Sequence, residues 1–557
     1  MNAQLGVAIS RKSNWADLGK ISIIGAMLFL PLVTGVNAQP ISPATEVERL
    51  NAQRLAELAA TPAQSGPVVI SQAAAQGQLV APGGPTVLLA RVDFSASEFL
   101  NQADLDTILS RYVGQRVDFS QIQQLVQDVN DLYTRKGVVT ASAVLPPQTL
   151  NNGILKVQLV EGTLATVALS GNKQVPDTFV LERVRLTTGN NTVDVPAAAE
   201  DITRFNKVYN AQLRMSLQPG AAFGTTDLVL EVTEPMKYQL SFFIDNEGIP
   251  STGDAQAGFF FRRYGLLTVD DNFLAYGTGA GGSTSGTLSY DAPITPTGTR
   301  LGLTYSSSAI TVIAGPTEPL NIRGSSESFG ATLTYPIYVS PTWSFFAIGG
   351  ASYGRSDSFS NATPLVDSAM QKNSLAINAS YTNQNMAFST RLNVSRAATE
   401  DFIDASTRDV TLWTGSFNGT YQLENGIALT TNGAWQYTNA ELIPGDLLFQ
   451  IGGPSTVRGF PSSASSGDSG YFAQFEAHKS VDADGWAEGI DIYGFVDVGQ
   501  VYSTFPEVVS FVSAGAGVAY PLADKAKFEV GVGFPLNQVV ANQDKAMIYA
   551  RLTFAAF

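Results

Sequence analysis

The stretch Lys527-Phe-Glu-Val-Gly-Val-Gly-Phe534 decides the fold class of this chain. Large apolar side chains occupy every second position, and charged residues or glycines stand between them. Because successive side chains of a β-strand point to opposite faces, one face of this segment is apolar and the other is polar or bare. A strand with two such faces fits between lipid and a water-filled lumen. The stretch therefore predicts a strand of a transmembrane β-barrel.

The same alternation recurs across residues 236–557. Arg300–Ser306 and Phe511–Tyr520 are two examples, and turn residues separate runs of roughly 9–13 residues. Bacterial barrels close with an even number of strands, so we expect an antiparallel barrel of about sixteen. The last run, Met547–Phe557, is apolar on one face, although Phe557 is out of phase with that face. A soluble β-sandwich or a solenoid is the alternative architecture.

Two copies of a small α+β module are predicted in front of the barrel. Residues 88–162 are predicted to form a strand, two helices and two strands, and residues 163–235 repeat that order. A repeated order of elements indicates tandem copies of one structural unit. Each unit is large enough for a modest hydrophobic core only.

The N-terminus has the features of an export signal over residues 1–38. Arg11 and Lys12 supply positive charge, Ile21–Val33 is apolar, and Ala38 is the small residue after which we expect cleavage. A membrane anchor is the alternative, but the apolar run is shorter than the ~20 residues that cross a bilayer.

Residues 39–87 contain one predicted helix and a linker. Over residues 45–60, Thr45 can cap the helix and Glu48 stands three positions later, as in a capping box. Four apolar side chains share one face of this helix: Val47, Leu50, Leu55 and Leu58. Residues 61–87 are rich in Ala, Gln, Gly and Pro, which predicts a linker. A disordered leader is the alternative.

Composition argues against several classes of function. The chain has 33 Lys and Arg against 48 Asp and Glu, a net charge of −15, whereas nucleic-acid binding needs a basic surface. With no cysteine and one histidine, His478, it offers almost nothing for a thiolate site, a histidine triad or a multi-histidine metal site. Gly277–Gly282 matches a nucleotide-binding pattern, but a strand follows where a helix is needed, which predicts a hairpin. We expect no enzyme activity, no catalytic residue, no metal, no cofactor and no nucleic-acid partner.

Two segments predict a contact inside the barrel. The Gly-rich stretch Ile451–Phe460 carries one arginine, Arg458, and the later strand Gly494–Gly499 places Asp497 on its lumenal face. A charge in a partly desolvated lumen is costly unless it is paired, so Arg458 and Asp497 could pair and hold the loop in one place. The alternative is an ordinary Gly-rich loop beside a carboxylate at the rim. His478 is expected to face the lumen or the rim.

These motifs resemble the hallmark of the BamA/TpsB superfamily of outer-membrane barrels. The motifs are Val457-Arg458-Gly459-Phe460 and Phe495-x-Asp497-x-Gly499. The first module is similar to that of the two-partner secretion transporters (TpsB, the hemolysin secretion/activation type). The segments that match are Leu132-Tyr-Thr-Arg-Lys-Gly137, Ala143-Val-Leu-Pro-Pro-Gln148 and Val160-Glu-Gly162. The chain departs from the family at Gly137-Val138, where Gly-Tyr is usual, and in its long linker.

The resemblance implies two POTRA domains in the periplasm, a sixteen-stranded outer-membrane barrel and a helix at residues 45–60 that plugs the lumen. It places Val457–Phe460 at the tip of a long loop after strand eleven or twelve, folded into the lumen with Arg458 against Asp497. The implied function is a monomeric pore that recognises one unfolded secreted partner, of β-helical type, through its POTRA domains. The pore would move this partner to the cell surface without ATP. A factor that assembles outer-membrane barrels, and a diffusion porin or receptor, are the other two candidates.

Overall fold

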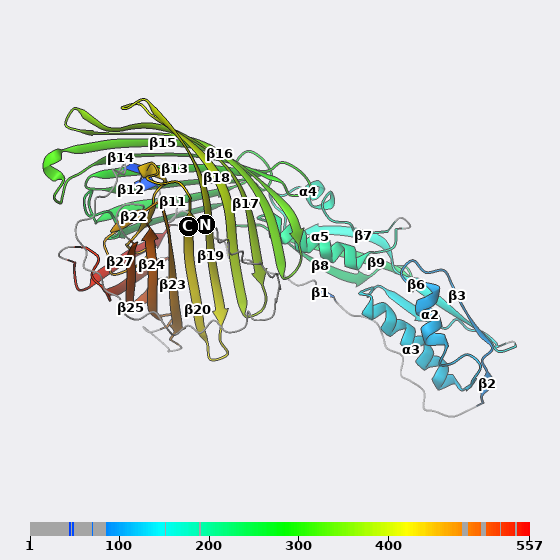
Figure 1. Ribbon diagram of the computed structural model, residues 1–557. Helices are drawn as coiled ribbons and strands as arrows, with labels where there is room; N and C mark the ends of the chain where they lie inside the picture. Colours follow the sequence, from blue (N-terminus) through cyan, green and yellow to red (C-terminus); the bar gives the residue numbers. More distant parts are fainter. Residues whose placement is uncertain are drawn as a thin grey trace, which may run out of the picture. The chain divides into compact units, whose positions relative to one another are not determined.

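A computed structural model gives the structure of the chain (Figure 1). It describes residues 44–45, 47–48, 69–70, 85–150, 152–188, 191–481, 488–502, 508–523, 525–540 and 543–556. The predicted signal peptide, residues 1–38, lies outside the described residues, as does most of the predicted helix 45–60. In the part of the chain that is described, no helix is long and apolar enough to cross a membrane.

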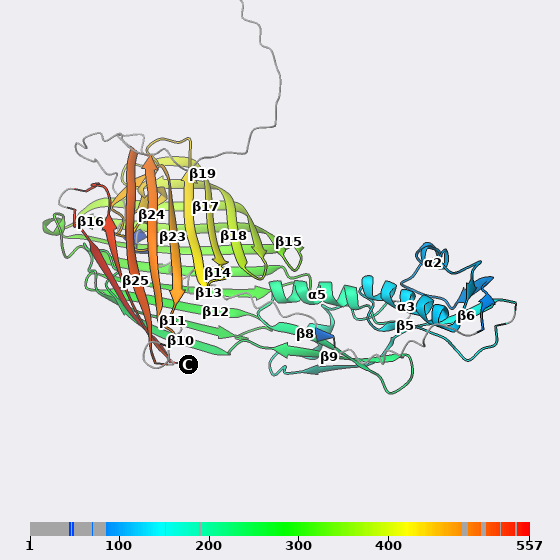
Figure 2. The ribbon, with the colours of Figure 1, turned by 90° about the horizontal axis from the view of Figure 1, so that it is seen from below.

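Sixteen antiparallel strands form a closed barrel (Figure 1), which confirms the predicted fold class. They follow one another in chain order, and the last strand pairs with the first. Closure pairs the backbone of every strand on both sides, as a lipid environment requires. The strands are β10 (Tyr238–Asp245), β11 (Gln256–Tyr264), β12 (Asn272–Ala280), β13 (Ser283–Pro293), β14 (Arg300–Thr311), β15 (Ile322–Val339), β16 (Trp343–Ser360), β17 (Thr363–Thr382), β18 (Met386–Asp401), β19 (Ser406–Gln422), β20 (Ile427–Tyr437), β23 (Ser469–Ser480), β24 (Asp491–Tyr502), β25 (Val508–Ala523), β26 (Ala526–Pro535) and β27 (Met547–Ala555). Figure 2 shows β23, β24 and β25 as neighbours in the wall. The glycine pattern between β12 and β13 forms a hairpin, as predicted.

Strand β26 has the two faces that its sequence predicts. Phe528 and Phe534 are exposed, by 37% and 46%, whereas Gly531 and Gly533 are buried. The apolar side chains therefore point outward to lipid, and the glycines point into the barrel.

Five consecutive strands are longer than the predicted runs. Strands β15 to β19, drawn in green to yellow in Figure 1, contain between 16 and 20 residues each. About 9–11 tilted residues cross the hydrocarbon layer, so these strands extend beyond it. Their Ser- and Gly-rich stretches resemble turns in the sequence. They remain in strands because the neighbouring strands are equally long and complete the hydrogen-bond ladder, as between β16 and β17.

The first module packs two helices against a three-stranded sheet with the order β3-β6-β5. Its elements are β2 (Val87–Leu88), β3 (Arg91–Phe94), α2 (Gln102–Leu109), β4 (Arg116–Val117), α3 (Phe119–Arg135), β5 (Ala141–Val144) and β6 (Ile154–Glu161). Both helices begin with capping boxes, from Asn101 to Asp104 and from Asp118 to Gln121. The core cluster includes buried residues from both helices, among them Leu125 of α3.

Apart from the two-residue strands β2 and β4 of the first module, the second module has the same order of a strand, two helices and two strands. They are β7 (Thr163–Ser170), α4 (Asp177–Leu181), α5 (Val195–Val208), β8 (Gln212–Pro219) and β9 (Thr225–Thr233). An additional strand, β1, comes from the predicted linker and pairs in parallel with β8. In this pairing Val69 lies opposite Ser216, and Ile70 lies opposite Leu217.

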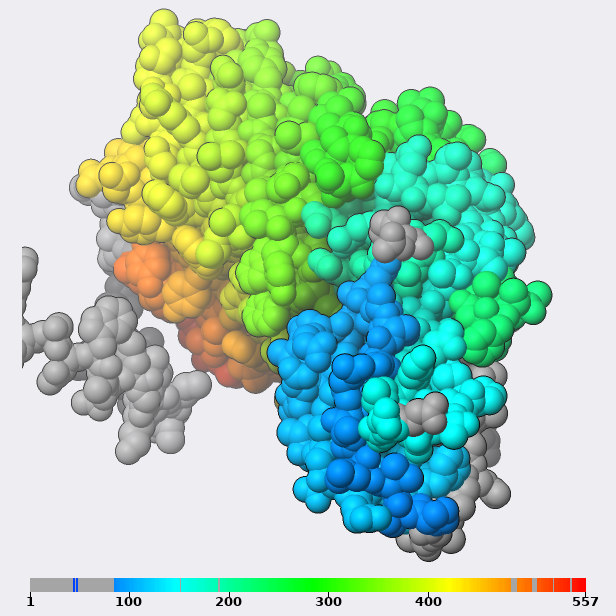
Figure 3. Space-filling model, turned by 90° about the vertical axis from the view of Figure 1, so that its right-hand side faces the viewer, coloured from blue at the N-terminus to red at the C-terminus, as the bar shows by residue number. Residues whose placement is uncertain are grey.

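Buried polar contacts join the second module to the barrel. Asp270, in the turn between β11 and β12, accepts the backbone N–H groups of Asn210 (2.8 Å) and Ala211 (3.0 Å). Arg300, the first residue of β14, donates to Asp270 at 2.9 Å and also pairs with Asp291. Figure 3 shows the turquoise surface of this module against the green surface of the barrel strands.

Candidate functional site

A long loop between β20 and β23 enters the lumen. It covers residues 438–468 and contains the short strands β21 (Phe449–Ile451) and β22 (Ser465–Gly467), which pair with each other. The four residues at its tip, Val457–Phe460, are all buried. Loops normally run over a protein surface, so a fully buried tip requires partners on the inner wall of the barrel.

Arg458 meets Asp497 through three hydrogen bonds. The arginine Nε and Nη2 donate to the two carboxylate oxygens at 2.8 and 2.7 Å, and its backbone N–H donates at 3.0 Å. Asp497 is 0% exposed, on the inner face of β24. A bidentate pair of this geometry is the strong form of a charge-assisted hydrogen bond. The structure thus brings together the two residues that the sequence singles out.

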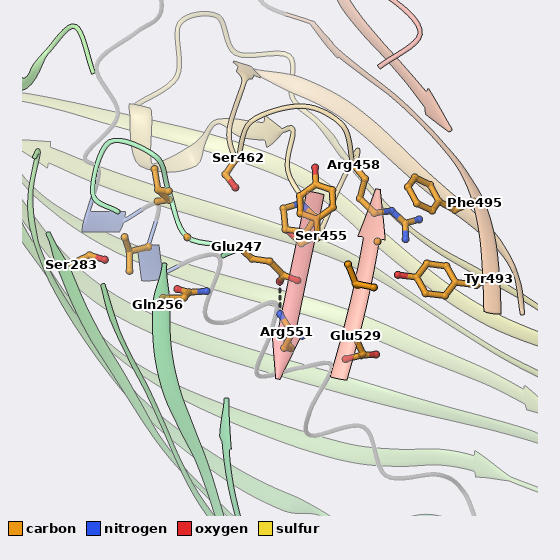
Figure 4. A pocket seen from close by; sticks show the side chains of 17 residues that line it. Glu247, Gln256, Ser283, Ser455, Arg458, Ser462, Tyr493, Phe495, Glu529 and Arg551 are labelled. Atoms are coloured by element: carbon orange, nitrogen blue, oxygen red, sulfur yellow. Dashed lines mark hydrogen bonds and ion pairs between the residues drawn. The ribbon is translucent and has the colours of Figure 1, made fainter. Parts of the chain in front are cut away.

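Two further groups surround the Arg458 guanidinium. Glu476, on the neighbouring strand β23, forms a second ion pair through Nη1 of Arg458. The ring of Phe495 lies 3.5 Å from the guanidinium carbon, a cation–π distance, and Figure 4 shows the two side chains close together. Sequence reasoning selected Phe495 but missed Glu476. The alternation of β23 could have placed Glu476 on the lumenal face together with His478.

His478 extends this group of charges along the wall. Its Nε2 lies 2.8 Å from Glu476, and its Nδ1 lies 2.7 Å from Asp491 at the start of β24. The ring also stacks on Tyr493, with 5.1 Å between centroids. His478 therefore faces the lumen and supports Glu476, which in turn holds Arg458.

The apolar residues of the loop form a small core inside the barrel. Phe460 packs edge-to-face on Phe511 of β25, with 4.8 Å between centroids. Val457 and Ile451 belong to the same buried cluster. Gly499 leaves room for it, because a Cβ at this position would lie 2.2 Å from Cδ1 of Ile451. The glycine of the second motif is thus a packing requirement of the loop.

The described part of the predicted plug helix lies against the inner wall. Val47 is 6% exposed and packs with Ile249 and Ile310. Glu48 accepts hydrogen bonds from Ser326 (2.8 Å) and Ser328 of β15. The other predicted residues of this face, Leu50, Leu55 and Leu58, lie outside the described residues.

A polar cavity of about 190 Å³ separates the plug residues from the loop. Val47, Arg458 and Arg551 all line it. Figure 4 shows the two arginines at this cavity. Arg551 of β27 pairs across the closing strands with Asp245 and Glu247. Over the described ranges, no group of three or more His, Asp or Glu residues could hold a metal ion.

Fold and site together define a class of protein: a sixteen-stranded outer-membrane barrel with a loop folded into its lumen and small α+β modules in front of it. A family model described as haemolysin secretion/activation protein ShlB/FhaC/HecB matches residues 224–520. A second model, POTRA domain of ShlB type, matches residues 87–162. The chain belongs to the ShlB/FhaC/HecB family. Its barrel lies in the outer membrane, with the POTRA domains in the periplasm.

Similar proteins support this assignment. The outer membrane transporter CdiB of Dickeya dadantii is 24% identical over 476 residues, which cover 82% of this chain and 84% of that protein. The heme/hemopexin transporter protein HuxB of Haemophilus influenzae is 22% identical, over 79% of this chain and 82% of that protein. The solved structure of CdiB from Escherichia coli superposes with a TM-score of 0.67 at 17% identity, over 93% of this chain and 100% of that chain. BamA from Haemophilus ducreyi has a TM-score of 0.51 at 14% identity, over 85% and 100% of the two chains. CdiB is named an outer membrane transporter and HuxB a heme/hemopexin transporter protein.

Proposed function

We propose that this chain exports one unfolded partner protein from the periplasm to the cell surface through its own lumen. The observation that carries the proposal is a polar lumen occupied by two segments of the same chain. Both the loop tip and the described plug residues make hydrogen bonds or ion pairs with the wall, beside two small apolar clusters. Such contacts can be exchanged for contacts with water or a passing polypeptide at small net cost. A resting pore of this kind can open without unfolding the barrel.

The first POTRA domain offers a place to capture an extended chain. Strand β3 pairs with β6 on one side, and no strand in the described part of the chain pairs with its other edge. Beside that edge lies a cavity of about 880 Å³, lined by β3 and by Leu105 and Leu109 of α2. A free strand edge next to a groove with both apolar and polar lining residues suits β-augmentation, in which the peptide backbone adds a strand.

The second POTRA domain already holds an extended segment of this kind. The linker strand β1 occupies the edge of β8 over two residue pairs. We infer that an arriving partner chain displaces β1, and that this displacement loosens the helix attached to the linker. The partner would then continue into the lumen.

Transport in this scheme uses no nucleotide. The driving force is capture of the unfolded chain on one side and its folding on the other, which makes return unfavourable. A secreted protein that folds into a β-helix strand by strand suits this process. The outer-membrane lipid is the second partner, and the pore acts as a monomer.

Assembly of other outer-membrane barrels is the alternative function, and the fold similarity to BamA is the observation that favours it. Two POTRA modules, rather than three or five, favour the exporter. An experiment separates the two functions. The chain is expressed with a candidate secreted protein, chosen first among those encoded beside it, and the culture medium is assayed for that protein. Export that depends on the chain supports the proposal. No export, combined with loss of unrelated outer-membrane barrels when the chain is depleted, would support assembly instead.

A further inference from the structure

The backbone of the loop tip is held by residues that belong to neither motif. Gly459 follows Arg458 and has a φ of +86°, a conformation that favours glycine. Its backbone N–H donates a hydrogen bond of 2.7 Å to the hydroxyl of Tyr549 on β27. Tyr549 is 8% exposed and points into the barrel, where it lines the same cavity as Arg458.

Gly459 also touches the bare backbone of β26. A Cβ built on Gly533 would lie 2.6 Å from the nitrogen of Gly459 and 3.0 Å from its Cα. A Cβ built on Gly459 would lie 3.0 Å from the nitrogen of Pro535. The atoms that would collide are backbone atoms, which cannot rotate away as the end of a side chain can. The two glycines therefore allow a backbone approach that no other residue pair permits.

We propose that Gly533 and Tyr549 form a seat for Gly459 and position the loop tip independently of the Arg458 ion pairs. This inference deepens the proposed function and rests on it. The seat places the loop on the last two strands of the barrel, whereas Asp497 and Glu476 hold it on β24 and β23. Two residues beyond Tyr549, Arg551 pairs with Asp245 of β10 at 3.2 Å. The strand that contacts the loop tip is thus the strand that closes the barrel.

The absence of cysteine from the chain permits a direct test of the seat. In the variant Val457→Cys, the only thiol is at a position that is 0% exposed while the tip is seated. A membrane-impermeant maleimide then reports how often the tip leaves the wall in the purified full chain, with no partner present. Gly533→Ala is added to this background. Gly330→Ala, on the inner face of β15, is the matched control, because its new Cβ would meet no heavy atom closer than 3.7 Å.

Gly533→Ala is expected to raise the labelling rate about tenfold or more, because a tip that loses its packing opens locally more often. The Gly330→Ala control should be labelled at the rate of the parent. Labelling of a folded Gly533→Ala variant at the parent rate would overturn the seat. Folding is checked by heat-modifiable mobility on a gel. If Gly533→Ala does not fold, Tyr549→Phe replaces it in the same measurement, because it removes the acceptor of the Gly459 N–H. Faster labelling of Tyr549→Phe supports the seat, and labelling at the parent rate overturns it.

The same variants keep this inference separate from the proposed function. Labelling needs no partner protein, so it reports on the seat alone. Faster labelling together with normal export would support the seat and contradict a role of the loop in export.

Discussion

Arg458 brings one positive charge into a part of the lumen that is largely closed to water, and it meets two carboxylates there. Removing ions from water costs several kcal/mol each, and the pairing recovers this cost only when the geometry is good. Asp497 provides such geometry through both of its oxygens. The pair therefore adds little net stability, yet loss of one partner leaves a buried charge. The Arg458–Asp497 pair therefore specifies one resting position for the loop more than it stabilises the fold.

Replacement of Arg458 by alanine should leave the barrel intact and stop export. In this variant Asp497 has no cation beside it and becomes an unpaired buried charge, which costs about 3–5 kcal/mol. The loop relieves this cost by leaving its position. Heat-modifiable mobility should be unchanged, while the partner protein disappears from the medium. Arg458→Lys is the control, because it keeps the charge and loses the bidentate contact, so its export should be intermediate. Full export by the alanine variant would refute the role.

Glu234 predicts a pH dependence of the second POTRA domain. Burial alone would raise the pKa of this carboxyl. The backbone N–H groups of Lys173, Gln174 and Val175 donate hydrogen bonds to it at 2.7, 2.7 and 2.8 Å. These bonds hold the pKa of Glu234 below its usual value. A lowered pKa in the folded state gives stability that is present above the usual carboxyl pKa and is lost as the pH falls through the lowered one. Hydrogen exchange of residues 163–235 in the full chain should therefore rise in acid. Glu234→Gln should show faster exchange at neutral pH and a weaker dependence on acid. An unchanged profile in this variant would contradict the assignment.

At the scale of elements, the linker strand β1 is held by a short pairing. Only two residue pairs join it to β8, whereas β8 and β9 pair over eight. An isolated pairing of this length is worth little and can open repeatedly. A partner chain that forms a longer strand would displace β1 from the edge of β8.

Prolines in place of Val69 and Ile70 should open the β8 edge permanently, because proline has no N–H to donate to a strand. We expect the partner protein to bind the full-length variant several-fold more tightly, since its site is no longer partly occupied. Threonines at both positions keep the strand propensity and are the control. The measurement is a binding titration on the detergent-solubilised chain. Equal affinity of the proline and threonine variants would show that β1 does not compete.

At the scale of the whole molecule, buried polar contacts hold the second POTRA domain against the barrel. Under the proposed function, this contact would set the place where a captured chain enters the lumen. Asp270 and Arg300 form its buried centre, with side-chain exposures of 2% and 12%. Polar contacts of this kind are directional, so they attach the second POTRA domain to the barrel and also set its orientation there.

Asp270→Asn should weaken this contact without unfolding either part. The amide still offers an acceptor to the N–H groups of Asn210 and Ala211, but it no longer neutralises Arg300. We expect a loss of about 1–3 kcal/mol in the local opening free energy, seen as faster hydrogen exchange in residues 265–271. Asp409→Asn is the control, because its pair with Arg396 is 56% and 71% exposed and surface pairs contribute little. Identical exchange in the two variants would contradict a central role for Asp270.

The sequence predicts the elements well where one local period dominates. The alternation in β26 identifies its two faces correctly, because each face meets a single environment along its whole length. Strands β15 to β19 exceed their predicted lengths, since pairing with an equally long neighbour overrides the turn preference of Ser and Gly. The strand at Val69–Ile70 was not predicted, although Val68, Val69 and Ile70 are β-branched residues that favour strands. Two residues carry no periodicity, and their partner β8 lies far away in the chain.

By itself, the sequence predicted the barrel, an even number of strands and the two modules, because these follow from alternation and repetition. The pairing of Arg458 with Asp497 was one of two alternatives from the residues alone, and the family resemblance favoured it. Only the tertiary structure decided what completes the site. Glu476, Gly533 and Tyr549 come from three different strands, and barrel closure brings them to one loop tip. Their function depends on distances between segments that are remote in the chain, and no local pattern records those distances.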